Sequence, residues 1–515
     1  MAASTVRPDA GAGPPSALRR GLRTFGTLLI VLSATTPASS VFVIAPGVIG
    51  QAGTGAFWSF AAAALVGVLM AFVYAELASA YPLTGGEYAI VGRTLGTLPG
   101  FVLLGLLLVT QVLIVAVIAL GAGTYLGVLV HGADPRVVAA VTIVAATVVA
   151  VLDIKVNALV TGVFLAIEMA ALGVLAGLGF GHVERPFTDL LAHPVVAAGG
   201  SGGGGGGLTA ASAGLIGAAT AVAIFAYNGY GSAVYFGEET HDAHRSIARA
   251  ILWALGITVA AELVPVTAVL LGAPDLGGLF ASSNMIGDFV TARGGSALDT
   301  ALSLAIALAI LNAVIAIVLL TARLLFSSGR DGTWSPRVDR GLRAIHPRFG
   351  TPWVATVLTG ALSAAACFVP ERFLLVVTGT SLVVVYGALC LAVLAGRRNG
   401  TTAHAAYRMP WFPLAPVAAL AALGYVIYQN ARDPAVGRPS LLVTALVMAV
   451  AAAYFVLVLR RRGGWVLKDA PGDGDAPGGP SAESNPGPGP DSDSGPGPGP
   501  DSGPGSGSAS GTGPR

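Results

Sequence analysis

Polar residues interrupt two apolar runs that are long enough to cross a membrane. In the first run, residues 25–50, the letters TTPASS occupy positions 35–40. Pro37 removes a backbone donor and clashes with the preceding turn, so the carbonyls of residues 32–34 lose their helical partners. In hydrocarbon such groups must be satisfied by protein, water or a bound solute. The pattern is typical either of a broken helix at a solute site or of a proline kink with hydroxyls bonded to their own helix.

The second interrupted run, residues 215–239, reads LIGAATAVAIFAYNGYGSAVYFGEE. Asn228, Gly229, Tyr230 and Gly231 place poor helix formers and polar side chains at its centre. The alternative explanation is that the glycines only allow close packing between membrane helices, where glycine is common. Two breaks at corresponding positions of two halves favour a transporter built from inverted repeats.

Glu168 is the one carboxylate that we place in the middle of a predicted span, residues 157–179. An ionised group at that depth is costly and is a candidate functional residue. Burial favours its neutral form, so Glu168 is suited to load and release a proton. The alternative is a protonated carboxyl that is bonded to a neighbouring backbone group and has only a structural role.

Composition assigns the chain to the polytopic membrane proteins. It has 515 residues, of which 54% are hydrophobic and 10% charged, and its mean hydropathy is +0.77. A membrane-embedded enzyme would need several acids or histidines converging within the spans, and a channel would need rings of charge or filter-like loops. Neither pattern is found, and all seven histidines fall in predicted loops. We therefore expect no enzymatic activity, no cofactor, no metal and no nucleic-acid partner.

The apolar pattern predicts an all-α protein with about twelve transmembrane helices. Arginines are concentrated before the first span and in alternate loops, which places both termini in the cytoplasm of a multi-pass protein of the cell membrane. The predicted spans are at about residues 25–50, 56–79, 98–129, 137–152, 157–179, 211–236, 247–271, 300–327, 352–369, 373–395, 412–428 and 441–459.

The domain organisation follows from these spans. Residues 1–23 form a basic cytoplasmic tail, and residues 463–515, rich in Gly, Pro, Ser and Asp, form a disordered cytoplasmic tail. Between them lies a transporter domain, residues 24–462. It consists of repeat one (about 24–180), an external glycine-rich linker (197–208), repeat two (about 211–396) and two further helices (about 411–460). The second repeat starts on the opposite side, so its topology is inverted.

Three blocks of sequence resemble the amino acid-polyamine-organocation (APC) superfamily of permeases. They are YAELASAYPLTGGEYAIVGRTLG at 74–96, GEETHDAHRSIARAI at 237–251 and TARLLFSSGRDGTWSP at 321–336. The resemblance covers about residues 19–462. It implies a five-plus-five inverted-repeat fold with broken helices 1 and 6, a central solute site, alternating access, and amino acids or related amines as substrates. The family usually has a Gly-Ser-Gly element at the first break, where this chain has PASS at 37–40.

Site residues are expected at both breaks and on neighbouring spans. Half-helix N-termini carry unpaired N–H groups and favour a substrate carboxylate, whereas carbonyls at the other break favour an ammonium. Phe225 or Tyr227 matches an aromatic residue of the family and offers a cation-π face. Gln111 and Asn312 either line the site or form interhelical hydrogen bonds. The candidates are Thr36, Ala38, Ser39, Ser40, Gln111, Phe225, Tyr227, Asn228, Gly229 and Asn312 for substrate, and Glu168 for proton coupling.

The sequence therefore predicts a permease for amino acids or related amines, coupled to protons, with an exchanger for amino acids or polyamines as the alternative. In proton-coupled relatives span five carries an ionisable residue in place of a bound sodium ion, and Glu168 matches that general region. A cationic substrate would be favoured by a second membrane carboxylate facing the first, and we expect none. We also expect Glu76 and Glu87 to pair with loop arginines such as Arg245 or Arg330, and Glu238 and Glu239 to lie in a solvated loop.

Overall fold

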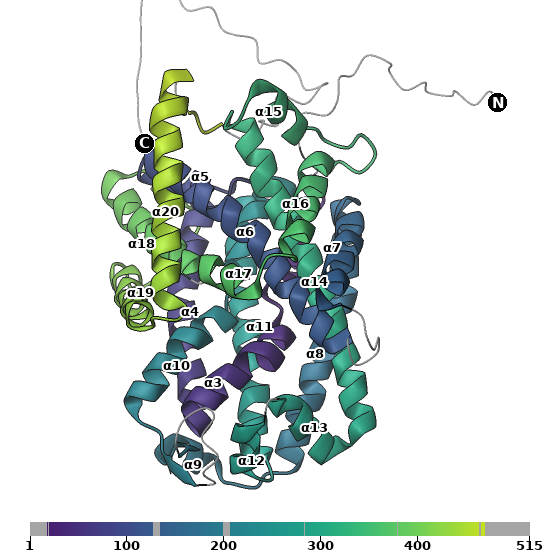
Figure 1. The fold of residues 1–515 in the computed structure, drawn as a ribbon. Helices are drawn as coiled ribbons and strands as arrows, with labels where there is room; N and C mark the ends of the chain where they lie inside the picture. Colours follow the sequence, from purple (N-terminus) through teal and green to yellow (C-terminus); the bar gives the residue numbers. More distant parts are fainter. Residues whose placement is uncertain are drawn as a thin grey trace, which may run out of the picture. The chain divides into compact units, whose positions relative to one another are not determined.

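The computed structural model describes residues 18, 20–126, 134–198, 207–282, 284–378, 380–462 and 465–468. Most of the predicted N-terminal tail, residues 199–206 of the glycine-rich linker and almost all of the predicted C-terminal tail lie outside this described part. Within it the chain is helical apart from one two-stranded sheet. This confirms an all-α polytopic membrane protein (Figure 1).

Nine helical runs of the described residues are long and apolar enough to cross a membrane. The first, Thr24–Ala80, contains the first two predicted spans, and two shorter apolar helices, α7 (Pro135–Ala150) and α16 (Trp353–Ala366), match the fourth and ninth. The other spans are α6 (Thr97–Leu126), α8 (Ile154–Gly181), α10 (Ala213–Ala226) with η3 (Tyr230–Glu239), α11 (Ala243–Gly272), α14 (Ser296–Arg330), α17 (Glu371–Thr378) with α18 (Ser381–Asn399), α19 (Leu414–Arg432) and α20 (Gly437–Tyr454).

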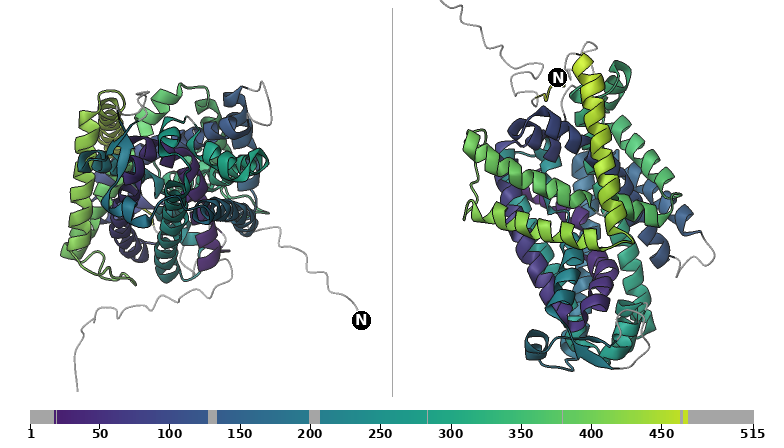
Figure 2. Two further views of the ribbon diagram at one scale, coloured as in Figure 1. Left: turned by 90° about the horizontal axis from the view of Figure 1, so that it is seen from below. Right: turned by 60° about the vertical axis from the view of Figure 1, so that its left-hand side comes forward.

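The last helices lie beside the two repeats. Figure 2 shows α18, α19 and α20, coloured green to yellow, gathered along one side of the other helices. Helix α20 packs against α6 and α19, and α19 packs against α4 (Ala56–Ala80). Spans 11 and 12 thus cover the core from outside and leave the broken helices in the interior.

The first span is broken where Pro37 predicted it. Helix α1 (Thr24–Thr35) ends at Thr36, whose φ of 47° and ψ of 66° are left-handed. A short turn, α2 (Pro37–Ser39), follows, then a π-helical segment, η1 (Ser40–Ile44), and α3 (Ala45–Ala52). Proline is compatible with the first helical position because it has no N–H to satisfy there. The chain therefore ends one helix at Thr36 and restarts another at Pro37, while the hydroxyls of Ser33 and Thr35 donate to carbonyls of their own helix, as the alternative interpretation expected.

The sixth span is broken at the predicted asparagine and glycine. Helix α10 ends at Ala226, and η3 begins after Gly229, whose φ is 124°. A β-carbon on Gly229 would lie 2.6 Å from the α-carbon of Thr35. The two breaks therefore touch through their backbones, and glycine is required at this contact.

Spans 1 and 6 run in opposite directions. At one end, Leu22 ahead of α1 forms a bridge with Thr240 after η3. At the other end, Gly53 after α3 packs against Val195 of strand β1 (Val195–Ala197), which precedes α10. Opposite directions of spans 1 and 6 are what the predicted pair of inverted repeats requires.

Two features of the fold were not predicted. The tenth span is divided into α17 and α18, because α17 ends at Thr378 and α18 begins only at Ser381. The glycine-rich linker is flanked by an antiparallel pair of strands, β1 and β2 (Leu208–Ala210), with Val196 opposite Thr209. Short helices fill the loops: α5 (Glu87–Thr94), α9 (Phe187–Ala192), α12 (Leu276–Ala281), α13 (Met285–Gly294) and α15 (Pro336–Leu342).

The contact between the breaks predicts that Gly229→Ala destabilises the protein. A side chain at this positive φ costs about 1–3 kcal/mol before any displacement of Thr35. The matched control is Gly173→Ala in α8, where no atom lies within 4 Å of the added carbon. Thermal unfolding in detergent should show a lower midpoint for Gly229→Ala and an unchanged or higher midpoint for the control. Equal midpoints for the two variants would contradict the backbone contact.

Candidate functional site

A cavity of about 970 Å³ lies at the two helix breaks. It is bordered by both broken spans, and α6 and α14 contribute its side walls. Seven of the ten predicted substrate-site residues line it: Thr36, Ser39, Ser40, Gln111, Phe225, Asn228 and Gly229.

The cavity has one exposed and one closed end. Its lining includes two exposed loop residues, Asn284 between α12 and α13, at the end of the molecule away from α5 and α15 (Figure 1), and Asp433 between α19 and α20. Toward the N-terminal face the lining ends at Tyr74, Glu87 and Tyr235, all of which are buried. The lining thus reaches exposed residues at the end near α12 and α13, and it ends at buried residues toward the N-terminal face.

Three hydrogen bonds organise the polar part of the lining. The Ser40 hydroxyl donates to the carbonyl of Ala226 at 2.8 Å, which ties the first break to the second. Thr36 Oγ1 donates to Ser39 Oγ at 2.7 Å within the first break. Tyr386 of α18 donates to the side-chain oxygen of Asn228 at 3.1 Å. The breaks are thus held to each other and to the tenth span.

Glu168 lies behind the first break and not in the cavity lining. The backbone N–H of Ala38 donates to Glu168 Oε1 at 2.8 Å, and the carboxyl is fully buried. Its second oxygen, Oε2, has no hydrogen-bond partner. Span 5 therefore supplies the acceptor for an amide that the break in span 1 leaves free.

The other three substrate candidates, Ala38, Asn312 and Tyr227, lie outside the lining. Asn312 donates from Nδ2 to Ser33 Oγ at 2.9 Å and so links α14 to α1. Tyr227 is buried edge-on against Phe60, with ring centroids 5.9 Å apart. Of the two roles expected for Asn312, the structure shows the interhelical hydrogen bond.

The sequence reasoning missed a second mid-span carboxylate, and the prediction that Glu168 stands alone is wrong. Glu262 lies in α11 and is 0% exposed, and neither of its oxygens has a hydrogen-bond partner. It interacts electrostatically with Glu168. The signal was visible in the letters ITVAAELVPVT, where an acid stands alone in an apolar span.

Glu76 pairs with an arginine, as expected, but with Arg397 and not with the two arginines named as examples, and the structure gives Glu87 a tyrosine as its partner. Glu76 forms a two-pronged ion pair with Arg397 of α18, with N–O distances of 2.7 and 2.6 Å. Glu87, at the closed end of the cavity, accepts a hydrogen bond from Tyr74 at 3.2 Å, and burial raises the pKa of its carboxyl. Arg397 follows the predicted end of span 10 at residue 395, and α18 extends far enough to include it, whereas the expected arginine partner of Glu87 is replaced by a tyrosine of span 2.

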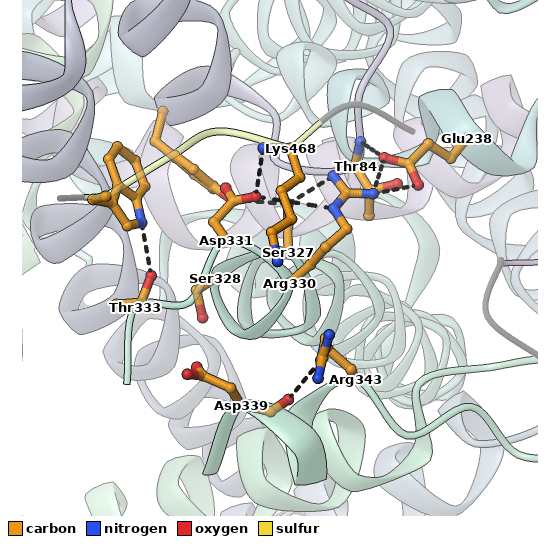
Figure 3. A network of polar contacts seen from close by, with 12 residues as sticks. Thr84, Glu238, Ser327, Ser328, Arg330, Asp331, Thr333, Asp339, Arg343 and Lys468 are labelled. Atoms are coloured by element: carbon orange, nitrogen blue, oxygen red, sulfur yellow. Dashed lines mark hydrogen bonds and ion pairs between the residues drawn. The ribbon is translucent and has the colours of Figure 1, made fainter. Parts of the chain in front are cut away.

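Glu238 and Glu239 do not lie in a solvated loop as expected. Glu239 pairs with Arg323, which is 0% exposed, through Nη2 at 2.8 Å and a second short contact from Nε. Glu238 pairs with Arg330 through two contacts of 2.8 Å and accepts the N–H of Thr84 (Figure 3). We call Glu238, Glu239, Arg323 and Arg330 the N-side ion-pair cluster. It fastens the end of span 6 to span 8.

A short segment after α20 packs on the same face. The N–H of Lys468 donates to Asp331 at 3.1 Å, and the indole of Trp465 donates to Thr333 at 3.2 Å (Figure 3). Trp465 is buried edge-on against Phe101 of α6, with centroids 5.2 Å apart. Burial raises the pKa of Asp331, which also accepts a hydrogen bond from Tyr88. The closed face thus includes residues from beyond the last span.

The described residues contain no group of three His, Cys, Asp or Glu side chains that could hold a metal ion. The polar groups that line the cavity are hydroxyls, amides and backbone atoms, apart from Glu87 and Asp433 near its two ends. Such a lining can bind a small polar molecule without a metal.

The buried pair Arg323–Glu239 generates a prediction. Glu239→Gln leaves Arg323 buried without a counter-charge, at a cost of roughly 3–5 kcal/mol. The double variant Glu239→Gln with Arg323→Met removes both charges and should recover most of the lost thermal stability in detergent. A double variant whose loss equals the sum of the two single losses would show that the pair does not act as a unit.

Comparison with known proteins agrees with this geometry. A family model described as "Amino acid permease" matches residues 22–458. An uncharacterized transporter of Mycobacterium tuberculosis (strain ATCC 25618 / H37Rv) is 30% identical over 354 residues, 68% of this chain and 74% of that protein. A methylthioribose transporter of Bacillus subtilis is 25% identical over 78% of this chain and 86% of its own length. The branched-chain amino acid permease BcaP of Bacillus subtilis is 23% identical over 78% of this chain and 85% of its own length.

The chain belongs to the amino acid permease family of the APC superfamily and is a transporter, not an enzyme.

Proposed function

We propose that this protein moves amino acids across the cell membrane by alternating access, driven by protons. The observation that carries the proposal is the cavity bounded by both helix breaks. A substrate carboxylate would lie at Ser39 and Ser40, where the restarted helix presents its N-terminal end. The ammonium group would lie at the carbonyl end of α10, near Phe225 and Asn228.

The walls of the cavity favour an apolar substrate side chain. The cavity is also lined by the apolar residues Leu107, Ile114 and Val117 of α6, Ile310 of α14 and Phe42 of η1. Apolar side chains at these positions stabilise a ligand by burying apolar surface. The name of the branched-chain permease relative is consistent with a substrate of this kind.

A cationic substrate such as a polyamine is less well supported than an amino acid. The sequence argument against it, that there is no second carboxylate in the membrane, was wrong. The second membrane carboxylate exists, but Glu168 and Glu262 are both fully buried and neither lines the cavity. A polyamine in the cavity would not contact them. Neutral amino acids therefore remain the preferred substrate class.

The orientation follows from charge and cavity access together. Arginines ahead of span 1 and in alternate loops support a cytoplasmic location for both termini and for the N-side ion-pair cluster. The open end of the cavity would then face outward, and the cluster would close the cytoplasmic side. We retain the predicted repeats, about 24–180 and 211–396, as the two units that move during transport.

Glu168 is the proposed coupling residue because it holds a backbone group of the break. An ionised carboxylate accepts a stronger hydrogen bond than a neutral carboxyl does. Protonation of Glu168 would therefore weaken its hold on the Ala38 amide and change the geometry of the substrate site. In an exchanger, by contrast, Glu168 would only stabilise the break, whatever its charge.

Uptake into proteoliposomes distinguishes these mechanisms. Labelled amino acids with apolar side chains are offered with and without an inward proton gradient. One proton per substrate supports roughly tenfold accumulation per pH unit of gradient. Wild type should accumulate substrate, and Glu168→Gln should take up only the amount seen without a gradient.

The control is Glu184→Gln, which removes an exposed carboxylate on the loop after α8. It should accumulate substrate as wild type does. Uptake that ignores the gradient but rises with internal substrate would indicate an exchanger and leave Glu168 with its structural role. Absence of uptake for every amino acid tested would contradict the proposed function itself.

A further inference from the structure

Glu262 is buried in α11 without any partner that explains its presence there. Both of its carboxyl oxygens lack a hydrogen bond, and so does the hydroxyl of Tyr227, which interacts electrostatically with it. Across the helix interface, Glu168 Oε2 is also buried without a partner. Three side chains from α8, α11 and the end of α10 thus bring unpaired polar atoms into one buried region.

No positive side chain compensates these two acids. In the part of the chain that the structure describes, no Lys, Arg or His forms an ion pair with Glu168 or Glu262. Of the titratable groups on the elements packed against α11, those that interact with Glu262 are Glu168 and Tyr227. While the pair is sealed from water, as it is in this structure, the two coupled carboxylates do not both ionise, so one of them holds a proton.

The hydrogen bond that Ser40 donates indicates which of the two carboxyl groups carries the proton. The Ser40 hydroxyl lies beside Glu262, lines the cavity and donates its only proton to the Ala226 carbonyl at 2.8 Å. It can therefore offer Glu262 only a lone pair. A hydrogen bond between them can form in this arrangement only if Glu262 carries the proton.

We propose that Glu262 and Glu168 form one proton-binding site behind the helix breaks, which exchanges its proton with the cavity through Ser40. The proposal rests on the proton-coupled transport proposed above and extends it to a residue on span 7. Of the two carboxyl groups, one is protonated while the other accepts the Ala38 amide. The pair titrates as a unit, since loss of either member removes the shared site.

This site links protonation to the contact between the breaks. When Glu262 is protonated, Ser40 donates to Ala226 and the two breaks are joined. When Glu262 is ionised, the Ser40 hydroxyl turns to donate to the carboxylate and the Ala226 carbonyl is released. During reloading, Ser40 accepts a proton from a hydronium ion in the cavity and passes its own proton to the Glu262 carboxylate, which leaves a neutral water, a neutral hydroxyl and a neutral carboxyl group.

The first test is proton-driven uptake by Glu262→Gln, Glu168→Gln and the double variant in proteoliposomes, together with substrate exchange at equal pH. Both single variants should lose gradient-driven accumulation by about tenfold per pH unit yet retain exchange. The double variant should be no worse than either one. The matched control is Thr258→Val, which changes a buried, unpartnered hydroxyl one turn earlier on α11 and should accumulate substrate normally.

Accumulation by Glu262→Gln equal to wild type would overturn the proposal. So would losses that multiply in the double variant, because they indicate independent sites. If folded Glu262→Gln loses both exchange and accumulation, Glu262 would be assigned to substrate binding instead. If Glu262→Gln does not fold, Glu262→Asp replaces it; altered pH dependence of accumulation supports the site, and an unchanged profile overturns it.

A second measurement needs no substrate and separates this proposal from the proposed function. Infrared spectra of the purified protein at mildly alkaline pH should show a protonated-carboxyl band that is absent from the double variant and present in Thr258→Val. The band would support the site even if no amino acid is transported. Identical spectra for wild type and the double variant would overturn it.

Discussion

The Ala38 amide and the Glu168 carboxylate form the contact on which the interior of this permease depends. A helix that stops and restarts within hydrocarbon leaves backbone groups that no water can satisfy. Here span 5 supplies the acceptor, 2.8 Å from the Ala38 N–H, and the Ala226 carbonyl at the second break accepts from Ser40. Each break is thus satisfied by side chains of other spans. The same bonds leave Ser39, Asn228 and Gly229 exposed to the cavity.

The two ends of the cavity differ in how they are closed. On the N-terminal face, ion pairs join span 6 to span 8 and span 2 to span 10. On the opposite face, the lining reaches exposed residues directly. Because buried ion pairs are costly to break singly, we expect these charges to separate together with a change in local solvation. Such a cooperative step suits a transporter with two discrete states.

The sequence predicted those parts of the structure that local chemistry decides. Pro37 and the pair Asn228-Gly229 located both breaks because proline and glycine disfavour a helix interior and here stand beside polar residues in the middle of apolar runs. Contacts between distant spans were not readable: Arg323 and Arg397 find their acids only after the helices pack. Glu262 is a different kind of omission. It was visible as an isolated acid in an apolar span, and only its proximity to Glu168 required the structure.

The central claim is that the two breaks together form the substrate site. The most direct test is an experimental structure of the protein in lipid with a transported amino acid bound. The account predicts density for the carboxylate at Ser39 and Ser40 and for the ammonium near Phe225 and Asn228, with the side chain against α6. Density that contacts neither break, or a carboxylate bound away from the restarted helix, would contradict it.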